Sequence, residues 1–160
     1  MCSSDLIGAY HVLAIRSDGI LFAWGDNTLG QLGTGNTYNF LNQYTNYSWS
    51  QVNNANNLAI RSDGALFNLS PLTQIGKSSW TQIATCGTPS YTTFANLGIN
   101  SSGYLYAWGG NAGNLISLPG LAGLGSVIDV DQNLSWSQLT ASASHALAIR
   151  SDGALFAWGY

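Results

Sequence analysis

The sequence predicts an all-β protein assembled from repeated units. The phrase at residues 11–25 returns at residues 145–159, and weaker copies lie at 56–67 and 95–109. Each copy consists of two apolar runs separated by a glycine turn, which is the pattern of a β-hairpin. No segment has a sustained helical period, so we expect almost no helix.

The spacing of the copies predicts a folded unit joined by loops of variable length. The turn glycines are separated by 45, 39 and 50 residues, and they are Gly19, Gly64, Gly103 and Gly153. A repeat of several tens of residues points to a solenoid, a propeller or an array. A Trp-x-Gln-aliphatic phrase precedes each of the last three copies and reads as another short strand. These phrases begin at Trp49, Trp80 and Trp136.

Both ends of the chain cut through a repeat, so we expect it to be an internal piece of a longer protein. Residues 1–6 have no counterpart in the repeat and are set apart as a non-native or disordered leader. Residues 7–160 are assigned to the repeats, which are incomplete at both ends, and no linker divides them.

Composition excludes several function classes. Charged residues make up 7% of the chain, its net charge is −3, and no basic cluster is present. Nucleic-acid binding is therefore not expected, because phosphate contacts need Lys and Arg. No apolar run is long enough for a transmembrane helix, so we expect no membrane insertion. Cys2 and Cys86 have no partners at metal-binding or redox spacing, so we expect neither a metal nor a cofactor.

The repeat resembles that of the regulator-of-chromosome-condensation family. The best stretch is 11–35, where Ala-Ile, Asp-Gly, Trp-Gly, Asn27 and Gly-Gln-Leu-Gly follow the family pattern in order; 136–159 is the second-best stretch. The resemblance implies a β-propeller with blades of small antiparallel sheets. About three units are present, so we expect a partial propeller, an open arc of about three blades. The second copy departs from the pattern, and we assign Asn68-Leu69 to the place of Trp-Gly.

The resemblance also raises a specific activity. The founding member of the family is a guanine nucleotide exchange factor for the small GTPase Ran, and it uses one propeller face and a protruding β-wedge. No wedge-like insertion can be assigned in this chain. Fold alone does not determine function, and many relatives have no exchange activity.

The residues that could carry chemistry are better explained by the repeat. His11 and His145 occupy one repeat position, and equivalent positions of different blades do not converge on a ligand. The Ser-Asp-Gly aspartates are expected to shape tight turns rather than to bind calcium; they are Asp18, Asp63 and Asp152. Asp129 and Asp131 are read as loop residues. All six tryptophans fall at repeat positions, so we expect them in the core rather than on a glycan-binding platform.

Three tyrosines of a variable segment are the best candidates for partner contact: Tyr38, Tyr44 and Tyr47. We therefore predict a non-catalytic scaffold that binds a protein partner through loops held on a rigid framework. No catalytic residues are assigned, so the protein is not expected to be an enzyme. Two alternatives remain open: nucleotide exchange on a small GTPase, and a cell-surface or virion structural protein that contacts glycans.

Overall fold

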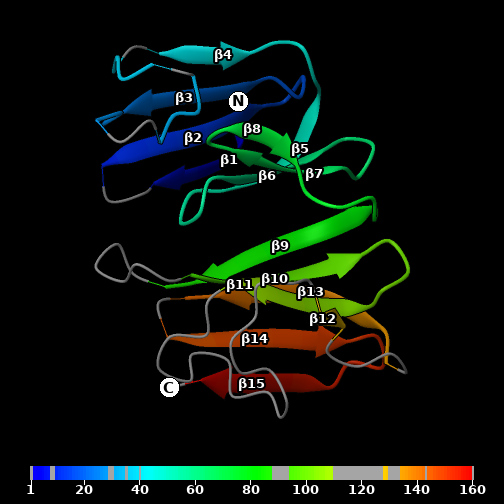
Figure 1. Ribbon diagram of the computed structural model, residues 1–160. Coiled ribbons are helices and arrows are strands. Elements are labelled where there is room, and N and C mark those ends of the chain that lie inside the picture. The colour runs from blue at the N-terminus through cyan, green and yellow to red at the C-terminus, as the bar shows by residue number, and fades with distance from the viewer. Residues whose placement is uncertain are drawn as a thin grey trace. The chain divides into compact units, whose positions relative to one another are not determined.

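The computed structural model contains strands only in the residues that it describes (Figure 1). These residues are 2–7, 10–28, 31–34, 36–39, 41–87, 94–109, 128–129, 134–142 and 144–159; for residues 2–7 and 128–129 only the backbone is described. The strands form four antiparallel sheets, and the prediction of an all-β chain is confirmed. The chain divides into two compact units, residues 1–79 and 80–160, which are described separately. The described part contains no helix long and apolar enough to cross a membrane.

The first unit contains two four-stranded sheets in which neighbouring strands are consecutive in the chain. The first sheet consists of β1 (Cys2–Ile7), β2 (His11–Arg16), β3 (Leu21–Gly25) and β4 (Asn42–Tyr44). The second sheet consists of β5 (Trp49–Asn53), β6 (Leu58–Arg61), β7 (Leu66–Leu69) and β8 (Leu72–Gln74). Short hairpin links suffice for this up-and-down order.

The second unit repeats the arrangement. Its first sheet consists of β9 (Trp80–Cys86), β10 (Ala95–Asn100), β11 (Leu105–Gly109) and β12 (Ile128–Asp129). The last sheet consists of β13 (Trp136–Ala141), β14 (His145–Arg150) and β15 (Leu155–Gly159). The described residues therefore form four sheets, one for each copy of the hairpin, where the sequence analysis expected about three blades.

Residues 2–7 add a fourth strand to the first sheet. Cys2 pairs with Arg16 and Ser4 with Ile15, and the register shifts between them. The Trp-x-Gln strand of the second sheet has the same register, with Trp49 opposite Arg61 and a shift before Gln51. Any extended segment can satisfy the backbone groups at the edge of β2, so this position needs no repeat motif. The expectation of a non-native or disordered leader at residues 1–6 stays a prediction.

The predicted hairpins are confirmed, and their turns share one geometry. In the first turn, the N–H of Gly19 donates to the carbonyl of Arg16 at 2.8 Å, and the N–H of Arg16 donates to the carbonyl of Ile20 at 2.9 Å. Gly19 has a φ of +85°, while Ser17 and Asp18 do not enter the positive-φ region. This is a type I turn followed by a glycine bulge, so the glycine alone supplies the left-handed residue.

The register of β7 corrects one sequence assignment. Phe67 lies opposite Ala59, as Phe22 lies opposite Ala14 in the first sheet. Counting from this pair, Leu69 rather than Asn68 takes the position of Trp24. Counting residues from the shared Ser-Asp-Gly turn gives the same result, so the sequence assignment of Asn68-Leu69 was displaced by one residue.

The two faces of each sheet differ in composition. We call the face carrying Leu13, Ile15 and Leu21 the leucine face of the first sheet. We call the opposite face, with Ala14, Phe22 and Trp24, its aromatic face. Successive residues of a strand point to opposite sides, so the two faces alternate along β2 and β3.

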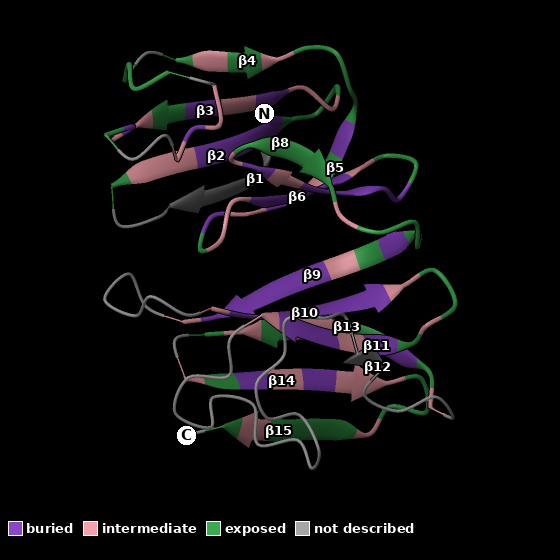
Figure 2. Cartoon of the chain, viewed as in Figure 1, coloured by how far each residue is buried: buried purple, intermediate pink, exposed green. Residues whose placement is uncertain are grey.

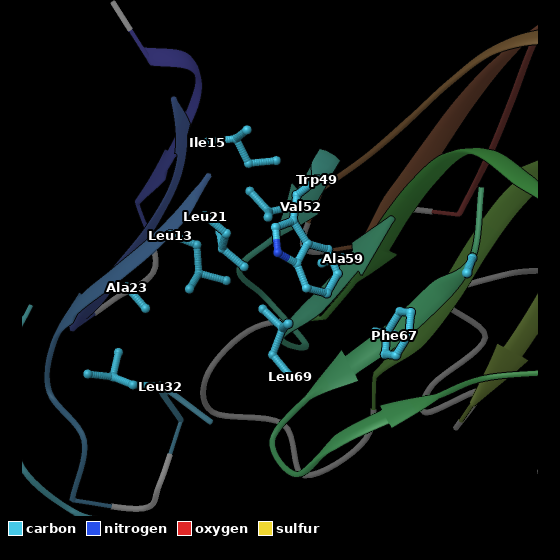
Figure 3. Packing of buried hydrophobic residues seen from close by; sticks show 11 residues of the cluster. Leu13, Ile15, Leu21, Ala23, Leu32, Trp49, Val52, Ala59, Phe67 and Leu69 are labelled. Atoms are coloured by element: carbon cyan, nitrogen blue, oxygen red, sulfur yellow. The ribbon is translucent and has the colours of Figure 1, made fainter. Parts of the chain in front are cut away.

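The core of the first unit is the contact between one leucine face and the next aromatic face. Leu13, Ile15 and Leu21 are 0 to 1% exposed and lie across from Trp49 and Phe67 of the second sheet (Figure 3). Trp49 meets Phe67 edge to face, with ring centroids 5.5 Å apart. Such ring pairs add roughly 0.5–1.5 kcal/mol to the burial of their area.

The second unit is built on the same contact. Ile99 and Leu105 of the leucine face pack against Trp136 and Ala148 of the last sheet. In both units the carbonyl of the turn glycine also accepts a hydrogen bond from the N–H of the tryptophan that begins the following sheet. These bonds are 2.8 Å long and join Trp49 to Gly19 and Trp136 to Gly103. The strands β9 and β10 are mostly buried, whereas β15 is largely exposed (Figure 2).

Two equivalent leucines provide a test of this packing. Leu21 is 0% exposed, and Leu155, at the same position of the last sheet, is 66% exposed. We expect Leu21→Ala to lower the free energy of unfolding by about 2–5 kcal/mol, because it leaves a cavity in the core. Leu155→Ala is expected to change it by less than about 0.5 kcal/mol. Urea denaturation followed by circular dichroism measures both; equal losses would contradict the assignment of the two faces.

Candidate functional site

The three Ser-Asp-Gly aspartates are turn residues, as predicted. Each carboxylate pairs with the arginine two residues earlier, and each accepts a hydrogen bond from the backbone N–H two residues later. The hydrogen bond to arginine is the main cause that lowers the pKa of these carboxyls; for Asp63 and Asp152 it falls to about 2. The arginines also stack on the ring that follows the turn, with Arg16 5.2 Å from the centroid of Phe22.

The turn at residues 100–103 has the same backbone geometry but no arginine–aspartate pair. Asn100 stands in the position of arginine, and its Oδ1 accepts hydrogen bonds from the N–H of Ser102 at 3.0 Å and of Tyr104 at 2.9 Å. Gly103 has a φ of +86°, as the other turn glycines do. Neither kind of turn gathers carboxylates into a cation site, and the described residues hold no group of three or more potential metal ligands.

The two histidines begin equivalent strands, β2 and β14, of the first and last sheets. The Nε2 of His11 lies 3.0 Å from the Oδ1 of Asn57, and the backbone carbonyl of His11 accepts a hydrogen bond from Asn54. His145 is exposed, and its carbonyl lies 3.6 Å from the buried thiol of Cys86. Burial raises the pKa of Cys86 to about 11, so the thiol stays protonated and unreactive at neutral pH.

Most tryptophans are buried, as the repeat positions predict. Trp49, Trp80, Trp136 and Trp108 are 2, 4, 7 and 9% exposed. Trp158 is partly buried, and Trp24 is 37% exposed. The exposed aromatic side chains of the described residues are Tyr10, Trp24, Tyr38, Tyr47, Tyr104 and Phe156. Asp131 and residues 110–127 lie outside the described residues, and of Asp129 only the backbone is described.

The three candidate tyrosines have different surroundings. Tyr44 lies in β4, donates its hydroxyl hydrogen bond to the carbonyl of Leu32 and packs against the core. Burial raises its pKa to about 12. Tyr47 lies between Trp49 and Phe67, at centroid distances of 5.8 and 5.7 Å. Tyr44 therefore supports the framework, whereas Tyr47 packs on these two rings with 38% of its surface exposed.

Tyr38 alone of the three projects largely into solvent, with 64% of its surface exposed. Its backbone is nevertheless held in place. The buried amide of Asn27 donates to the carbonyl of Tyr38 at 2.9 Å and to that of Asn36 at 2.8 Å. The result is an exposed ring on an anchored segment.

Asn27 organises this connection from within. It is 0% exposed, and its Oδ1 also accepts the N–H of Leu32 at 2.9 Å, which brings Leu32 into the core. The neighbouring Asp26 accepts hydrogen bonds from the N–H of Thr28 and from the amide of Gln31. The hydrogen bond from Thr28 is the main cause that lowers the pKa of Asp26. The sequence marked Asn27 as part of the family pattern, but only the structure shows its role.

An open groove lies beside this segment on the aromatic face of the first sheet. It has a volume of about 760 Å³, and its lining is largely apolar. Phe22 and Trp24 line it from the sheet, and Asn39 and Leu41 line it from the connection to β4. The geometry offers exposed rings, an apolar groove and one ion-paired arginine, Arg16. These groups can bind a partner without covalent chemistry.

The fold defined by these sheets is that of a β-propeller. A structure of human WBSCR16 is similar to the chain with a TM-score of 0.76 and 19% identity, over 99% of this chain and 48% of that one. Yeast RCC1 (Prp20), in a complex with Kap60, gives a TM-score of 0.74 and 15% identity, over 99% and 44% of the two chains. The chain therefore spans less than half the length of these propellers, and the prediction of a partial propeller is confirmed.

The family model assigns the repeat. Residues 7–31 match the regulator of chromosome condensation (RCC1) repeat. Prp20p from Saccharomyces cerevisiae is also similar, with a TM-score of 0.69 and 13% identity over 92% of this chain and 43% of its own. Residues 7–31 thus match a repeat of the regulator of chromosome condensation type, as the sequence pattern predicts, and the described sheets share the propeller fold.

The role of Asn27 can be tested with an isosteric change. Asn27→Asp replaces the donor to two carbonyls by an oxygen, so we expect a loss of about 2–4 kcal/mol in the free energy of unfolding. Asn53→Asp is the matched control, because the Oδ1 of Asn53 accepts a hydrogen bond from the N–H of Ala55 and a carboxylate can do the same. Urea denaturation of both variants gives the comparison; a stable Asn27→Asp variant would contradict the anchoring role.

The arginine–aspartate pairs of the turns predict that the free energy of unfolding decreases at low pH. The pKa of Asp63 and of Asp152 is lowered from 3.8 to about 2 in the fold. Their stabilising contribution is therefore complete above pH 3.8 and is lost as the pH falls toward 2. We expect the urea midpoint to decrease over this interval, and to decrease less in a double variant Asp63→Asn, Asp152→Asn. An identical acid profile in the variant would show that these pairs do not contribute.

Proposed function

We propose that the protein is a non-catalytic, protein-binding propeller module whose contact residues lie in the connection between β3 and β4. One observation carries this proposal: the ring of Tyr38 is 64% exposed while the buried Asn27 holds its backbone. An exposed aromatic ring on an anchored segment loses little conformational entropy on binding, and such residues dominate the binding energy of many interfaces.

The charge of the chain is consistent with a basic or neutral protein as the partner. The protein has a net charge of −3, and the arginines of the described turns are paired with aspartates. A basic or neutral protein surface fits such a face better than an acidic one does. The structurally similar Prp20p has binding properties toward Gsp1p and histones, and these two proteins are therefore defined probes for the chain.

The binding test compares Tyr38 with Tyr10, a tyrosine that is even more exposed. The immobilised chain is titrated with purified core histones and with purified Gsp1p, and biolayer interferometry gives the dissociation constants. We expect Tyr38→Ala to weaken binding at least about 10-fold, the effect of losing a central aromatic contact. Tyr10→Ala, which removes a ring that is 76% exposed, is expected to change it less than about 2-fold, as for a peripheral residue.

Equal effects of the two substitutions would overturn the assignment of the binding segment. Binding of neither probe would remove both as partners and favour the glycan-binding alternative, which a glycan array then tests with Trp24 and Tyr38 as the exposed rings.

Nucleotide exchange on a small GTPase is the second candidate, supported by the similarity of the fold to Prp20p. Its test is the rate at which Gsp1p releases a fluorescent GDP analogue in the presence of the chain. Acceleration that Tyr38→Ala abolishes would assign exchange to the same segment. Binding of Gsp1p without acceleration would favour a scaffold.

A further inference from the structure

The only lysine in the sequence lies in the segment that joins the two compact units. Lys77 lies between β8 and β9, and the first unit ends at Ser79. Residues 76–79 are all exposed (Figure 2). Strands flank this segment on both sides, so its surroundings do not depend on the ends of the sequence. The four basic residues of the chain are Arg16, Arg61, Lys77 and Arg150.

The backbone around Lys77 lies outside the hydrogen bonding of the sheets. The N–H of Ile75 donates to a carbonyl of β7 at 2.8 Å, and the Oγ of Ser79 donates to the carbonyl of Asp63 at 3.4 Å. Between these two points, Lys77 and Ser78 form no hydrogen bond with any residue that the structure describes. The peptide bond that joins them is therefore held only through its neighbours.

The residues before Lys77 can leave the fold at a low cost in free energy. β8 is the edge strand of its sheet, and all three of its residues are exposed. Gly76 has a φ of +65°, and a Cβ added to it would meet nothing within 4 Å. Segments with few buried contacts open readily, and they are preferred sites of proteolytic cleavage because a protease must bind an extended stretch of chain.

The three arginines lie in a more protected environment. Each of them donates its N–H to the carbonyl four residues later and accepts the N–H of the turn glycine, at 2.8 to 2.9 Å. Each guanidinium also pairs with the turn aspartate and stacks on the ring that follows the turn. Trypsin recognises a basic side chain through a carboxylate in its specificity pocket. The arginines already have such a partner, whereas Lys77 forms no ion pair with any described residue.

We propose that the Lys77–Ser78 bond is a cleavage site for an endopeptidase of trypsin-like specificity, which cuts the chain at the boundary of its two compact units. Hydrolysis consumes one water molecule. The C–N bond between Lys77 and Ser78 breaks, the carbonyl carbon of Lys77 becomes a carboxylate, and the nitrogen of Ser78 becomes an ammonium group. The products are residues 1–77 and 78–160. The site does not involve Tyr38, and it stands independently of the proposed binding function.

Limited digestion of the folded chain with trypsin tests the site. Mass spectrometry of early time points is expected to show residues 1–77 and 78–160 as the first pair of fragments. Cleavage after the three arginines is expected to be at least about 100-fold slower, because each turn must open before it can be cut. Synthetic peptides of residues 72–82, 11–21, 56–66 and 145–155 give the intrinsic rate for each bond, to which the rates of the folded chain are normalised.

Two substitutions of the same lysine provide matched variants. Lys77→Gln removes the charge that the protease recognises, so the loss of intact chain is expected to be at least about 100-fold slower. Lys77→Arg is expected to keep cleavage by trypsin and to lose cleavage by a lysine-specific endopeptidase. Circular dichroism verifies that both variants are folded, as expected for substitutions of an exposed residue.

Three results would overturn the proposal. These are a first cut of the folded chain after an arginine, loss of intact Lys77→Gln at the rate of the unsubstituted chain, and a normalised rate of cleavage after Lys77 that is no greater than the rate at the turns.

Discussion

Every sheet contact described in the protein depends on one constraint: a strand presents alternate residues to opposite sides, and each sheet separates its leucines from its aromatic rings. The leucine face of the first sheet is buried against Trp49 and Phe67, and that of the third against Trp136 and Ala148. A slip of one residue in register would exchange the two faces of a sheet and destroy both contacts at once. The shared bulge at the start of the edge strands, and the glycine turns at the other end, hold that register.

This constraint explains why so few residues are free to carry function. The buried tryptophans, the turn aspartates and His11 serve packing or turn geometry, and two of the three candidate tyrosines contact the core. Variation is tolerated in the connections, where a segment needs only to return the chain to the next sheet. The segment between β3 and β4 combines both properties, because Asn27 anchors it internally while Tyr38 remains exposed.

The sequence predicted the hairpins, the turn glycines and the buried tryptophans because each depends on local pattern. It could not predict the strand at residues 2–7, since an edge strand pairs through its backbone and carries no motif. It placed Tyr38, Tyr44 and Tyr47 together because they are close along the chain. The structure separates them through contacts with Leu32, Trp49 and Asn27 that lie across turns and sheets, and these contacts leave no mark in the sequence.

The third turn has a consequence for how such repeats diverge. One backbone shape is held by an arginine–aspartate pair in three copies and by the side-chain carbonyl of Asn100 in the other. Because two different side-chain interactions can hold this turn, a copy can lose the arginine and aspartate of the repeat and keep its hairpin. Sequence similarity between copies is therefore lost sooner than the fold. The family model matches residues 7–31, although the described residues form four sheets of the same kind. Strand register is therefore a better guide than residue identity to the relationship between such repeats.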